Sequence, residues 1–207
     1  GAIGGTMPDL DVLIRSSEDP LLFLDFHRHF THSLAFIPLG GVIAAAATRL
    51  LLRGRQSLKQ LWLPATLGWA THGLLDSCTS YGTFLLWPFS TARIAWHNVA
   101  IIDPLFTLPL VAGALLAMRR KNRTLAKAAL TWGVLYLLFG LVQRDRAAAV
   151  YAAVQAERGH AAATAEVKPS LANNFLFRGF YLHKGRYYAD SIRVPWLGEP
   201  TVYSGES

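Results

Sequence analysis

The feature that most constrains this chain of 207 residues is where its acidic residues are missing. Residues 26–142 contain two acids, Asp76 and Asp103, and apolar stretches fill most of that span. A helix that crosses a bilayer needs roughly 17–25 residues of this kind. We predict about four such spans, at residues 33–52, 61–75, 99–118 and 125–142. The predicted fold is a mainly α, polytopic membrane bundle that ends in a small extracytoplasmic α/β extension.

The basic residues predict the orientation of these spans. Arg53, Arg55 and Lys59 lie between the first and second spans, and residues 119–123 add a second basic cluster between the third and fourth. Lys and Arg accumulate in cytoplasmic loops. The connection 77–98 and everything after residue 142 should therefore face outward from a bacterial-type inner membrane. This pattern explains the net charge of +7 as topology, so we expect no nucleic-acid partner.

A change of composition after residue 142 predicts a second domain. Residues 143–164 are rich in alanine with scattered charges, which predicts a water-exposed helix broken at 168–170. Residues 175–202 carry aromatic and β-branched residues separated by Gly and Pro, which predicts a few short strands. We therefore expect a transmembrane domain with a metal site over 1–142 and an extracytoplasmic extension over 143–207. The small residues at 1–6 are typical of a helix end, so we also expect that an N-terminal helix is missing.

Ionisable side chains beside the predicted spans are the candidate functional residues, because such groups are costly in a membrane. Four separate segments place them at about the same depth, near the outer surface. They are Asp9 and Asp11; His27, Arg28 and His32; His72 and Asp76; and Asp103.

Their chemistry indicates a metal site. His72 and Asp76 are four residues apart, so both project from one helix face. Asp9 and Asp11 flank a single residue, so a turn can direct both carboxylates to one side. Imidazole and carboxylate ligands together suit zinc, manganese or iron, and we expect a divalent cation, zinc or manganese. Several such ligands would also allow two ions, and Arg28 could bind an anionic group of a substrate.

Each candidate also has an ordinary structural interpretation. An isolated Asp-x-Asp is most often a solvated turn, and a helical His-x-x-x-Asp is more often a hydrogen-bonded pair than a metal site. Asp103 precedes Pro104 and could be a helix N-cap. Because the membrane region holds almost no other acids, we favour a shared polar site. The single cysteine, Cys78, excludes a disulfide framework within one chain.

An ordered series of motifs over roughly residues 1–110 resembles the YdjM-type family of predicted membrane-bound, metal-dependent hydrolases. The motifs are GGTMPDLD at 4–11, HRHFTHS at 27–33, HGLLD at 72–76, TSYGT at 79–83, WPFS at 87–90 and IDP at 102–104. The resemblance implies an inner-membrane protein of a few helices with a metal centre. It maps the site to Asp9, Asp11, His27, Arg28, Thr31, His32, His72, Asp76 and Asp103.

The leading functional hypothesis is a metal-dependent hydrolase in which a metal-activated water attacks an ester or phosphoester at the outer membrane surface. The substrate would be a membrane lipid or a lipid-linked molecule. We assign Asp11, Arg28 and His27 to catalysis, and the metal to Asp9, Asp11, His27, His32, His72, Asp76 and Asp103. The alternatives are a non-enzymatic metal-binding or transport protein and a metal-braced structural or partner-binding protein.

Overall fold

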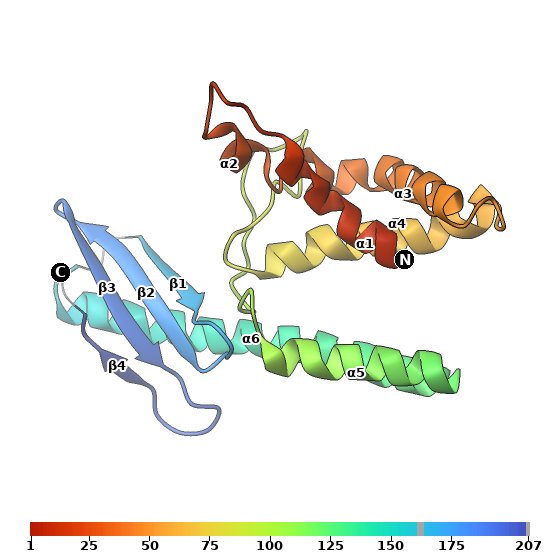
Figure 1. Ribbon diagram of the computed structural model, residues 1–207. Helices are drawn as coiled ribbons and strands as arrows, with labels where there is room; N and C mark the ends of the chain where they lie inside the picture. Colours follow the sequence, from red (N-terminus) through yellow and green to blue (C-terminus); the bar gives the residue numbers. More distant parts are fainter. Residues whose placement is uncertain (161–163, 206–207) are drawn as a thin grey trace. The chain divides into compact units, whose positions relative to one another are not determined.

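The computed structural model describes residues 1–160 and 164–205, which form two compact units, Gly1–Ala95 and Trp96–Ser207 (Figure 1). The predicted domain boundary after residue 142 falls inside a continuous helix of the second unit.

The first unit is built around two long helices, with short helical turns before them. Its elements are α1 (Ala2–Thr6), η1 (Met7–Leu13), α2 (Leu22–Phe26), η2 (Phe30–His32), η3 (Leu34–Phe36), α3 (Ile37–Leu51) and α4 (Leu58–Cys78). A capping box between Ser57 and Gln60 begins α4. The core of the unit holds buried residues of α3 and α4, namely Ala44, Ala45, Leu61, Ala65 and Trp69.

Small residues bring α1 against α4 (Figure 1). A Cβ atom on Gly4 would lie 2.2 Å from the Ala65 carbonyl oxygen, and one on Gly68 would lie 2.2 Å from that of Gly1. Real Cβ atoms do not approach so closely, so glycine at these positions permits the contact between the two helices. The helix expected at the small N-terminal residues is present as α1, and its packing places η1 beside α4.

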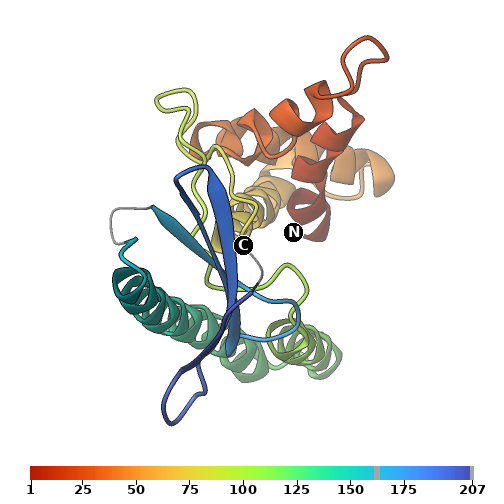
Figure 2. The same cartoon turned by 90° about the vertical axis from the view of Figure 1, so that its left-hand side faces the viewer.

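The second unit combines a helical hairpin with an antiparallel sheet. Helix α5 (Pro104–Arg120) runs beside α6 (Arg123–Glu157), and the later part of α6 lies along one face of the sheet (Figures 1 and 2). The strands follow in the order β1 (Ala165–Pro169), β2 (Leu176–His183), β3 (Arg186–Arg193) and β4 (Thr201–Tyr203). Tyr151 of α6 is fully buried against the sheet, and Gly179 of β2 leaves room for its ring.

The mainly α character and the short C-terminal strands are confirmed, whereas four spans are not. Among the described residues, two helical segments are long and apolar enough to cross a membrane, Leu34–Leu51 and Arg123–Glu157. Only 22% and 17% of their most apolar windows are buried, so most of this apolar surface has no protein partner. Helix α4 interrupts its apolar run with His72 and Asp76. Helix α5 has 17 residues because it begins at Pro104, where we had expected a span from residue 99.

Two further predictions are corrected by the structure. The span at 125–142 and the helix at 143–164 are one helix, α6, which ends at Glu157; residues 161–163 lie outside the described part of the chain. Lys168 and Pro169, read as helix breakers, belong to strand β1. This strand lies at the edge of the sheet, where a proline that donates no hydrogen bond is tolerated.

A partly buried ion pair joins the residue after α6 to the sheet and predicts a pH dependence. Arg158 donates two hydrogen bonds to Asp190, at 2.6 and 3.0 Å. Burial would raise the pKa of the Asp190 carboxyl, but the hydrogen bonds from Arg158 and the Gly205 N–H and the charge of Arg158 together outweigh it and hold this pKa below its ordinary value of 3.8. The contribution of Asp190 to stability is therefore present above pH 3.8 and is lost as the pH falls below that value.

We expect the contribution of this pair to the melting temperature in detergent to stay constant between pH 6 and pH 5. Below about pH 4 the melting temperature should fall, because Asp190 becomes protonated. In Asp190→Asn the baseline stability should be lower and the acid-dependent loss smaller. An unchanged acid-dependent loss in this variant would show that Asp190 is not its source.

Candidate metal centre

Helix α4 supplies two of the candidate ligands from adjacent turns. His72 and Asp76 lie one turn apart, with His72 Nε2 3.7 Å from Asp76 Oδ2. The intervening Gly73 faces η2, and a Cβ atom there would lie 2.5 Å from the carbonyl oxygen of His32. Glycine at this position therefore lets η2 lie directly against α4, which brings His32 to His72.

The turn η1 supplies the two carboxylates that the Pro-Asp-x-Asp motif predicts. Pro8 occupies the first turn of η1, where its missing N–H costs nothing. The side chain of Asp9 is about half exposed and reaches the two histidines. Asp11 instead is directed inward, and its side chain is fully buried.

Asp11 organises the segment that contains the remaining candidates. Its Oδ1 accepts a hydrogen bond from His27 Nδ1 at 2.9 Å. Its Oδ2 accepts bonds from the Arg28 N–H at 2.9 Å and the Thr31 hydroxyl at 2.8 Å, and lies 3.3 Å from His32 Nδ1. Arg28 adopts a left-handed backbone conformation, with φ of 64°, which turns the chain around the carboxylate. One buried side chain thus contacts four of the six residues of the HRHFTH motif.

Four ligand atoms converge on one point: Asp9 Oδ1, His32 Nε2, His72 Nε2 and Asp76 Oδ2. The two Nε2 atoms are 3.1 Å apart, and each lies 3.3–3.6 Å from Asp9 Oδ1. Asp76 Oδ2 lies 3.3 Å from His32 Nε2 and 3.7 Å from His72 Nε2. Zinc bonds of about 2.0–2.1 Å place neighbouring ligand atoms of a tetrahedron about 3.3–3.4 Å apart. The donor set therefore has the spacing of a zinc site.

The second nitrogen of each imidazole explains why these Nε2 atoms can serve as ligands. His72 Nδ1 lies 2.6 Å from the carbonyl oxygen of Gly5, which can only accept a hydrogen bond. His32 Nδ1 lies 2.9 Å from the Thr31 hydroxyl and close to the Asp11 carboxylate. Both Nδ1 atoms therefore carry the hydrogen, and both Nε2 atoms present lone pairs. Two lone pairs 3.1 Å apart repel each other unless a cation or a proton lies between them.

The carboxylate of Asp76 also indicates that a cation belongs between these side chains. Its Oδ2 atom is buried and has no hydrogen-bond partner in the described part of the chain. The nearest cation is the guanidinium of Arg28, whose Nε lies 3.1 Å away without hydrogen-bond geometry. A buried carboxylate oxygen without a donor is costly, and a metal ion at the centre of the four donors would satisfy it.

The pKa shifts show that the centre attracts positive charge. Burial would raise the pKa of Asp11, but hydrogen bonds from His32, His27 and Thr31 outweigh it and hold this pKa far below its ordinary value. Burial would lower the pKa of His32, but the nearby carboxylates of Asp11 and Asp76 together outweigh it and raise this pKa. The environment of His32 thus favours a positive charge in its ring.

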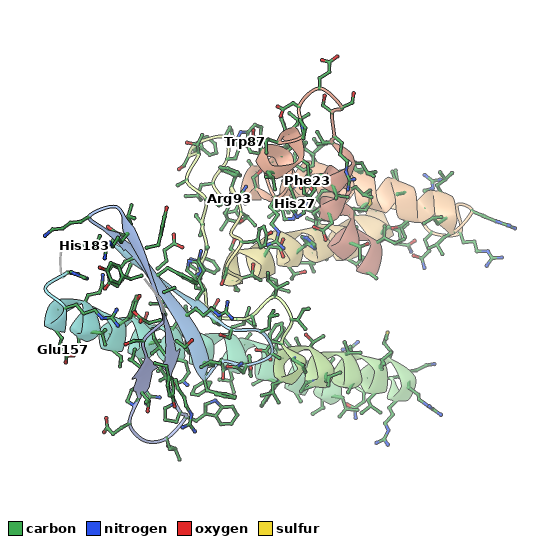
Figure 3. The ribbon with its side chains drawn as sticks, turned by 60° about the vertical axis from the view of Figure 1, so that its left-hand side comes forward. Phe23, His27, Trp87, Arg93, Glu157 and His183 are labelled. Atoms are coloured by element: carbon green, nitrogen blue, oxygen red, sulfur yellow. The ribbon has the colours of Figure 1, made fainter. Side chains whose placement is uncertain are left out.

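A second group of ligand atoms adjoins the first. Atoms of Asp9, Asp11 and His27 lie within 4.8 Å of one another, and Asp9 belongs to both groups. His27 stacks on Phe23 at 5.2 Å between ring centroids (Figure 3). Its Nδ1 is engaged by Asp11, so its Nε2 is the nitrogen that remains for other chemistry.

The structure thus gathers six of the seven candidate ligands in the first unit, whereas Asp103 belongs to the second. There Asp103 caps α5, since its Oδ1 accepts hydrogen bonds from the N–H groups of Leu105 and Phe106. Its Oδ2 accepts a bond from the Tyr136 hydroxyl at 2.8 Å. Both oxygens therefore have structural partners, in agreement with the helix N-cap interpretation.

Sequence reasoning did not assign three residues that shape this centre. The Gly5 carbonyl orients His72, and Gly73 allows η2 to pack directly against α4. The Trp69 indole donates a 2.7 Å hydrogen bond to the carbonyl oxygen of Thr31. The glycine next to His72 was the available indication, because a glycine inside a helix commonly marks a close backbone approach. The Trp69 contact spans 38 residues and has no local sequence pattern.

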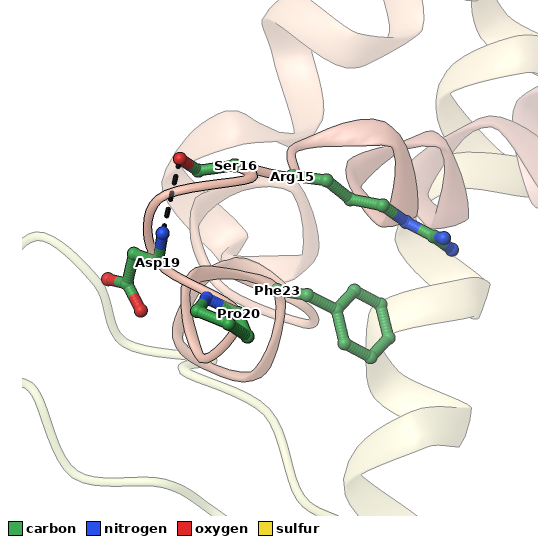
Figure 4. Close-up of a pocket in the computed structure, with 5 residues that line it drawn as sticks. All are labelled: Arg15, Ser16, Asp19, Pro20 and Phe23. Atoms are coloured by element: carbon green, nitrogen blue, oxygen red, sulfur yellow. Dashed lines mark hydrogen bonds between the residues drawn. The ribbon is translucent and has the colours of Figure 1, made fainter.

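A cleft of about 260 Å³ lies within residues 15–23 of the first unit. Arg15, Ser16, Asp19, Pro20 and Phe23 line it, and Ser16 accepts a hydrogen bond from the Asp19 N–H (Figure 4). The Arg15 guanidinium lies 5.4 Å from the centre of the Phe23 ring. Since Phe23 also stacks on His27, this cleft adjoins the second group of ligand atoms.

The substitution Gly73→Ala should separate His32 from His72. A methyl group there would clash with the His32 carbonyl, so we expect a loss of about 1–3 kcal/mol in stability together with weaker metal binding. Thermal unfolding and metal titration would measure both effects.

Gly5→Ala is the matched control for this substitution. Its Cβ atom would make an ordinary 3.5 Å contact with the Gly68 carbonyl oxygen and would leave the Gly5 carbonyl in place. If Gly73→Ala binds metal as tightly as Gly5→Ala, the close approach of η2 does not position the ligands.

Fold and site together describe a mainly helical protein with two candidate membrane spans among the described residues and a group of residues that could hold a metal ion. The chain belongs to the family described as YdjM inner membrane protein, which it matches over residues 1–147. This membership confirms the resemblance carried by the motifs and supports an inner-membrane location.

Two curated relatives each match about half of this chain. The chain is 30% identical over 101 residues to the uncharacterized protein YfhP of Bacillus subtilis (strain 168), and 32% identical over 105 residues to the inner membrane protein YbcI of Escherichia coli (strain K12). Each match covers 49% of this chain, and they cover 30% of YfhP and 60% of YbcI. No solved structure matches the chain.

Proposed function

We propose that the chain is a metal-dependent hydrolase that holds a divalent cation, zinc or manganese, between Asp9, His32, His72 and Asp76. The convergence of two oriented Nε2 atoms and two carboxylate oxygens at 3.1–3.7 Å carries this proposal. A cation bound there would supply Lewis-acid chemistry and lower the pKa of water. The substrate class is an ester or phosphoester, lipid or lipid-linked, at the outer face of the inner membrane.

Asp11 and His27 form a dyad suited to general base catalysis. The buried Asp11 carboxylate accepts the hydrogen of His27 Nδ1, which leaves Nε2 free to take a proton from water. Asp11 also orients His32, so its role is to position both histidines, while Asp9, with its exposed side chain, forms the open side of the centre. This division of roles refines the assignment of Asp11 as both ligand and catalytic group.

Arg28 is the candidate for binding an anionic group of the substrate. Its Nη1 donates a hydrogen bond to Thr79, its Nε lies beside Asp76, and its guanidinium lies over the ring of Tyr81. The Nη2 atom takes part in none of these contacts, so it can donate to a phosphate or carboxylate oxygen. A planar guanidinium fixed on several sides is well suited to such an oxyanion.

The proposed orientation follows from the charges. The basic residues between α3 and α4 and between α5 and α6 favour a cytoplasmic position for those connections. His72 and Asp76 lie near the opposite end of α4, and the sheet follows the opposite end of α6, so we expect each of them on the outer side.

A panel of phosphomonoester, phosphodiester and carboxylester substrates tests this function on the full chain in proteoliposomes. We expect hydrolysis that disappears with a chelator and returns with zinc or manganese. His27→Gln should lower kcat by about 10²–10⁴-fold while metal content stays unchanged. Folded, metal-loaded protein that hydrolyses none of the panel would overturn the hydrolase assignment and leave the metal centre standing.

A metal-braced structural role is the second candidate, and one observation favours it. The four donors come from η1, η2 and α4, so the protein could fill a tetrahedral coordination shell by itself, as structural zinc sites do. In that case removal of the metal lowers the melting temperature, and His27→Gln has no effect on any reaction.

A further inference from the structure

The helical hairpin of the second unit has two chemically different ends. The turn between α5 and α6 is basic, with Arg119, Arg120, Lys121 and Arg123. Aromatic residues gather at the other end: the Trp132 indole donates to the Leu105 carbonyl oxygen, and Phe139 lies edge-on to Trp196, 5.8 Å between ring centroids. Aromatic side chains of this kind mark the membrane–water interface.

One arm of this hairpin, α5, is short for a bilayer. Helix α5 has 17 residues, or about 25 Å at 1.5 Å per residue, whereas the hydrocarbon core is about 30 Å thick. A segment shorter than the hydrocarbon core is accommodated by local thinning of the bilayer, by snorkelling of flanking residues or by oligomerisation. Further apolar surface at the end of α5 would also lengthen its apolar band.

The loop between β3 and β4 supplies such a surface. Its Leu197 is 92% exposed and its Trp196 is 52% exposed. Together with Leu105, Phe175, Arg193 and Pro195, Trp196 lines a cleft of about 350 Å³ at the aromatic end of the hairpin.

Polar residues of α6 hold this loop in place. The Gln143 amide donates to the carbonyl oxygen of Val194, and Arg146 donates to those of Pro195 and Gly198. The Trp196 indole donates to Asn174 Oδ1 at 3.1 Å. These hydrogen bonds hold the backbone of the β3–β4 loop in place, and this backbone keeps Leu197 exposed.

We propose that this loop inserts into the leaflet at the aromatic end of the hairpin, with Trp196 and Leu197 at the boundary between headgroups and acyl chains. The loop extends the apolar band of α5, and Arg193 at the rim of the cleft binds a lipid phosphate. The continuity of the loop with the unpartnered apolar surface of α5 and α6 identifies lipid as the occupant. This proposal does not depend on the hydrolase function.

An environment-sensitive fluorophore at position 197 of the full chain tests the insertion. In a Cys78→Ser background, Leu197→Cys is labelled and reconstituted in vesicles of phosphatidylglycerol and phosphatidylethanolamine. Lys184→Cys is the matched control, because the β2–β3 turn lies at the other end of strand β3. We expect blue-shifted emission and quenching by brominated acyl chains at 197, and quenching by aqueous iodide at 184. If Cys78→Ser does not fold, the native Cys78 is kept and a labelled parent chain gives the background.

Three outcomes decide the proposal. Quenching by brominated lipid at 197, independent of the protein-to-lipid ratio, supports insertion. Equal iodide quenching at the two positions overturns it. A blue shift that appears only at high protein density assigns the loop to contact between two copies of the chain, which also overturns it.

Discussion

Replacing His72 and Asp76 together by alanine is expected to remove the bound divalent cation from the purified protein. The double substitution deletes two of four converging donors, one of them a carboxylate oxygen with no hydrogen-bond partner among the described residues. Loss of a group that only orients a ligand weakens metal binding about 10–100-fold. Loss of two ligands should therefore lower the metal affinity at least about a hundredfold. Metal content after dialysis and a competition titration measure the change.

The matched control deletes a histidine and an aspartate elsewhere. His183→Ala/Asp145→Ala removes the same side-chain types from the second unit and should retain the metal. Circular dichroism of both variants separates loss of the metal from loss of the fold. Retention of stoichiometric metal by a folded His72→Ala/Asp76→Ala protein would contradict the proposed ligand set.

Asp11→Asn is expected to weaken metal binding without removing any of the four ligands of the proposed centre. The carboxylate accepts hydrogen bonds from His27, the Arg28 N–H and the Thr31 hydroxyl, and it lies beside His32 Nδ1. An amide replaces one accepting oxygen by a donor, which leaves buried donors facing each other. We expect metal affinity to fall about 10–100-fold and stability to fall by about 1–3 kcal/mol for each group left unpaired.

Asp25→Asn is the appropriate comparison, since Asp25 is an exposed acid on α2 of the same unit. Isothermal titration with zinc and thermal unfolding of the metal-free proteins measure the two effects separately. If Asp11→Asn lost all binding, as the ligand variant does, Asp11 would be a ligand and not a positioning residue. Unchanged affinity and stability would show that the Asp11 network does not organise the centre.

The ligand-bearing segments could be predicted from the sequence because their patterns are local. Four-residue spacing on a helix determines that His72 and Asp76 share a face, and the scarcity of acids made them conspicuous. The different roles of Asp9, a proposed ligand, and Asp11, a positioning residue, could not be predicted. They depend on the left-handed turn at Arg28. Residues 27–32 wrap around Asp11 and leave Asp9 to face His72.

Asp103 illustrates the opposite case. Its predicted depth favoured a ligand, and its place before Pro104 favoured a helix cap. The Tyr136 hydroxyl that occupies its second oxygen is 33 residues away in the sequence, on α6. A contact of that separation arises from the packing of α5 on α6, which no local pattern encodes.

In the C-terminal unit, residue periodicity predicted the strands but not the full length of α6. Alternation of buried and exposed residues in β2 and β3 follows the aromatic and β-branched pattern that predicted strands. The continuity of α6 was missed, because Gln143, Arg144 and Arg146 follow an apolar stretch and resemble a boundary. In the structure, Gln143 and Arg146 serve the packing of the sheet and its loop within one helix.

X-ray absorption at the zinc edge of the purified, zinc-loaded chain tests the metal centre most directly. The arrangement of Asp9, His32, His72 and Asp76 predicts scattering from two imidazole rings and from oxygen ligands at zinc bond lengths of about 2.0–2.2 Å. The imidazole contribution should disappear in His72→Ala/Asp76→Ala. A folded protein that binds no zinc, or binds it without imidazole scattering, would contradict the account.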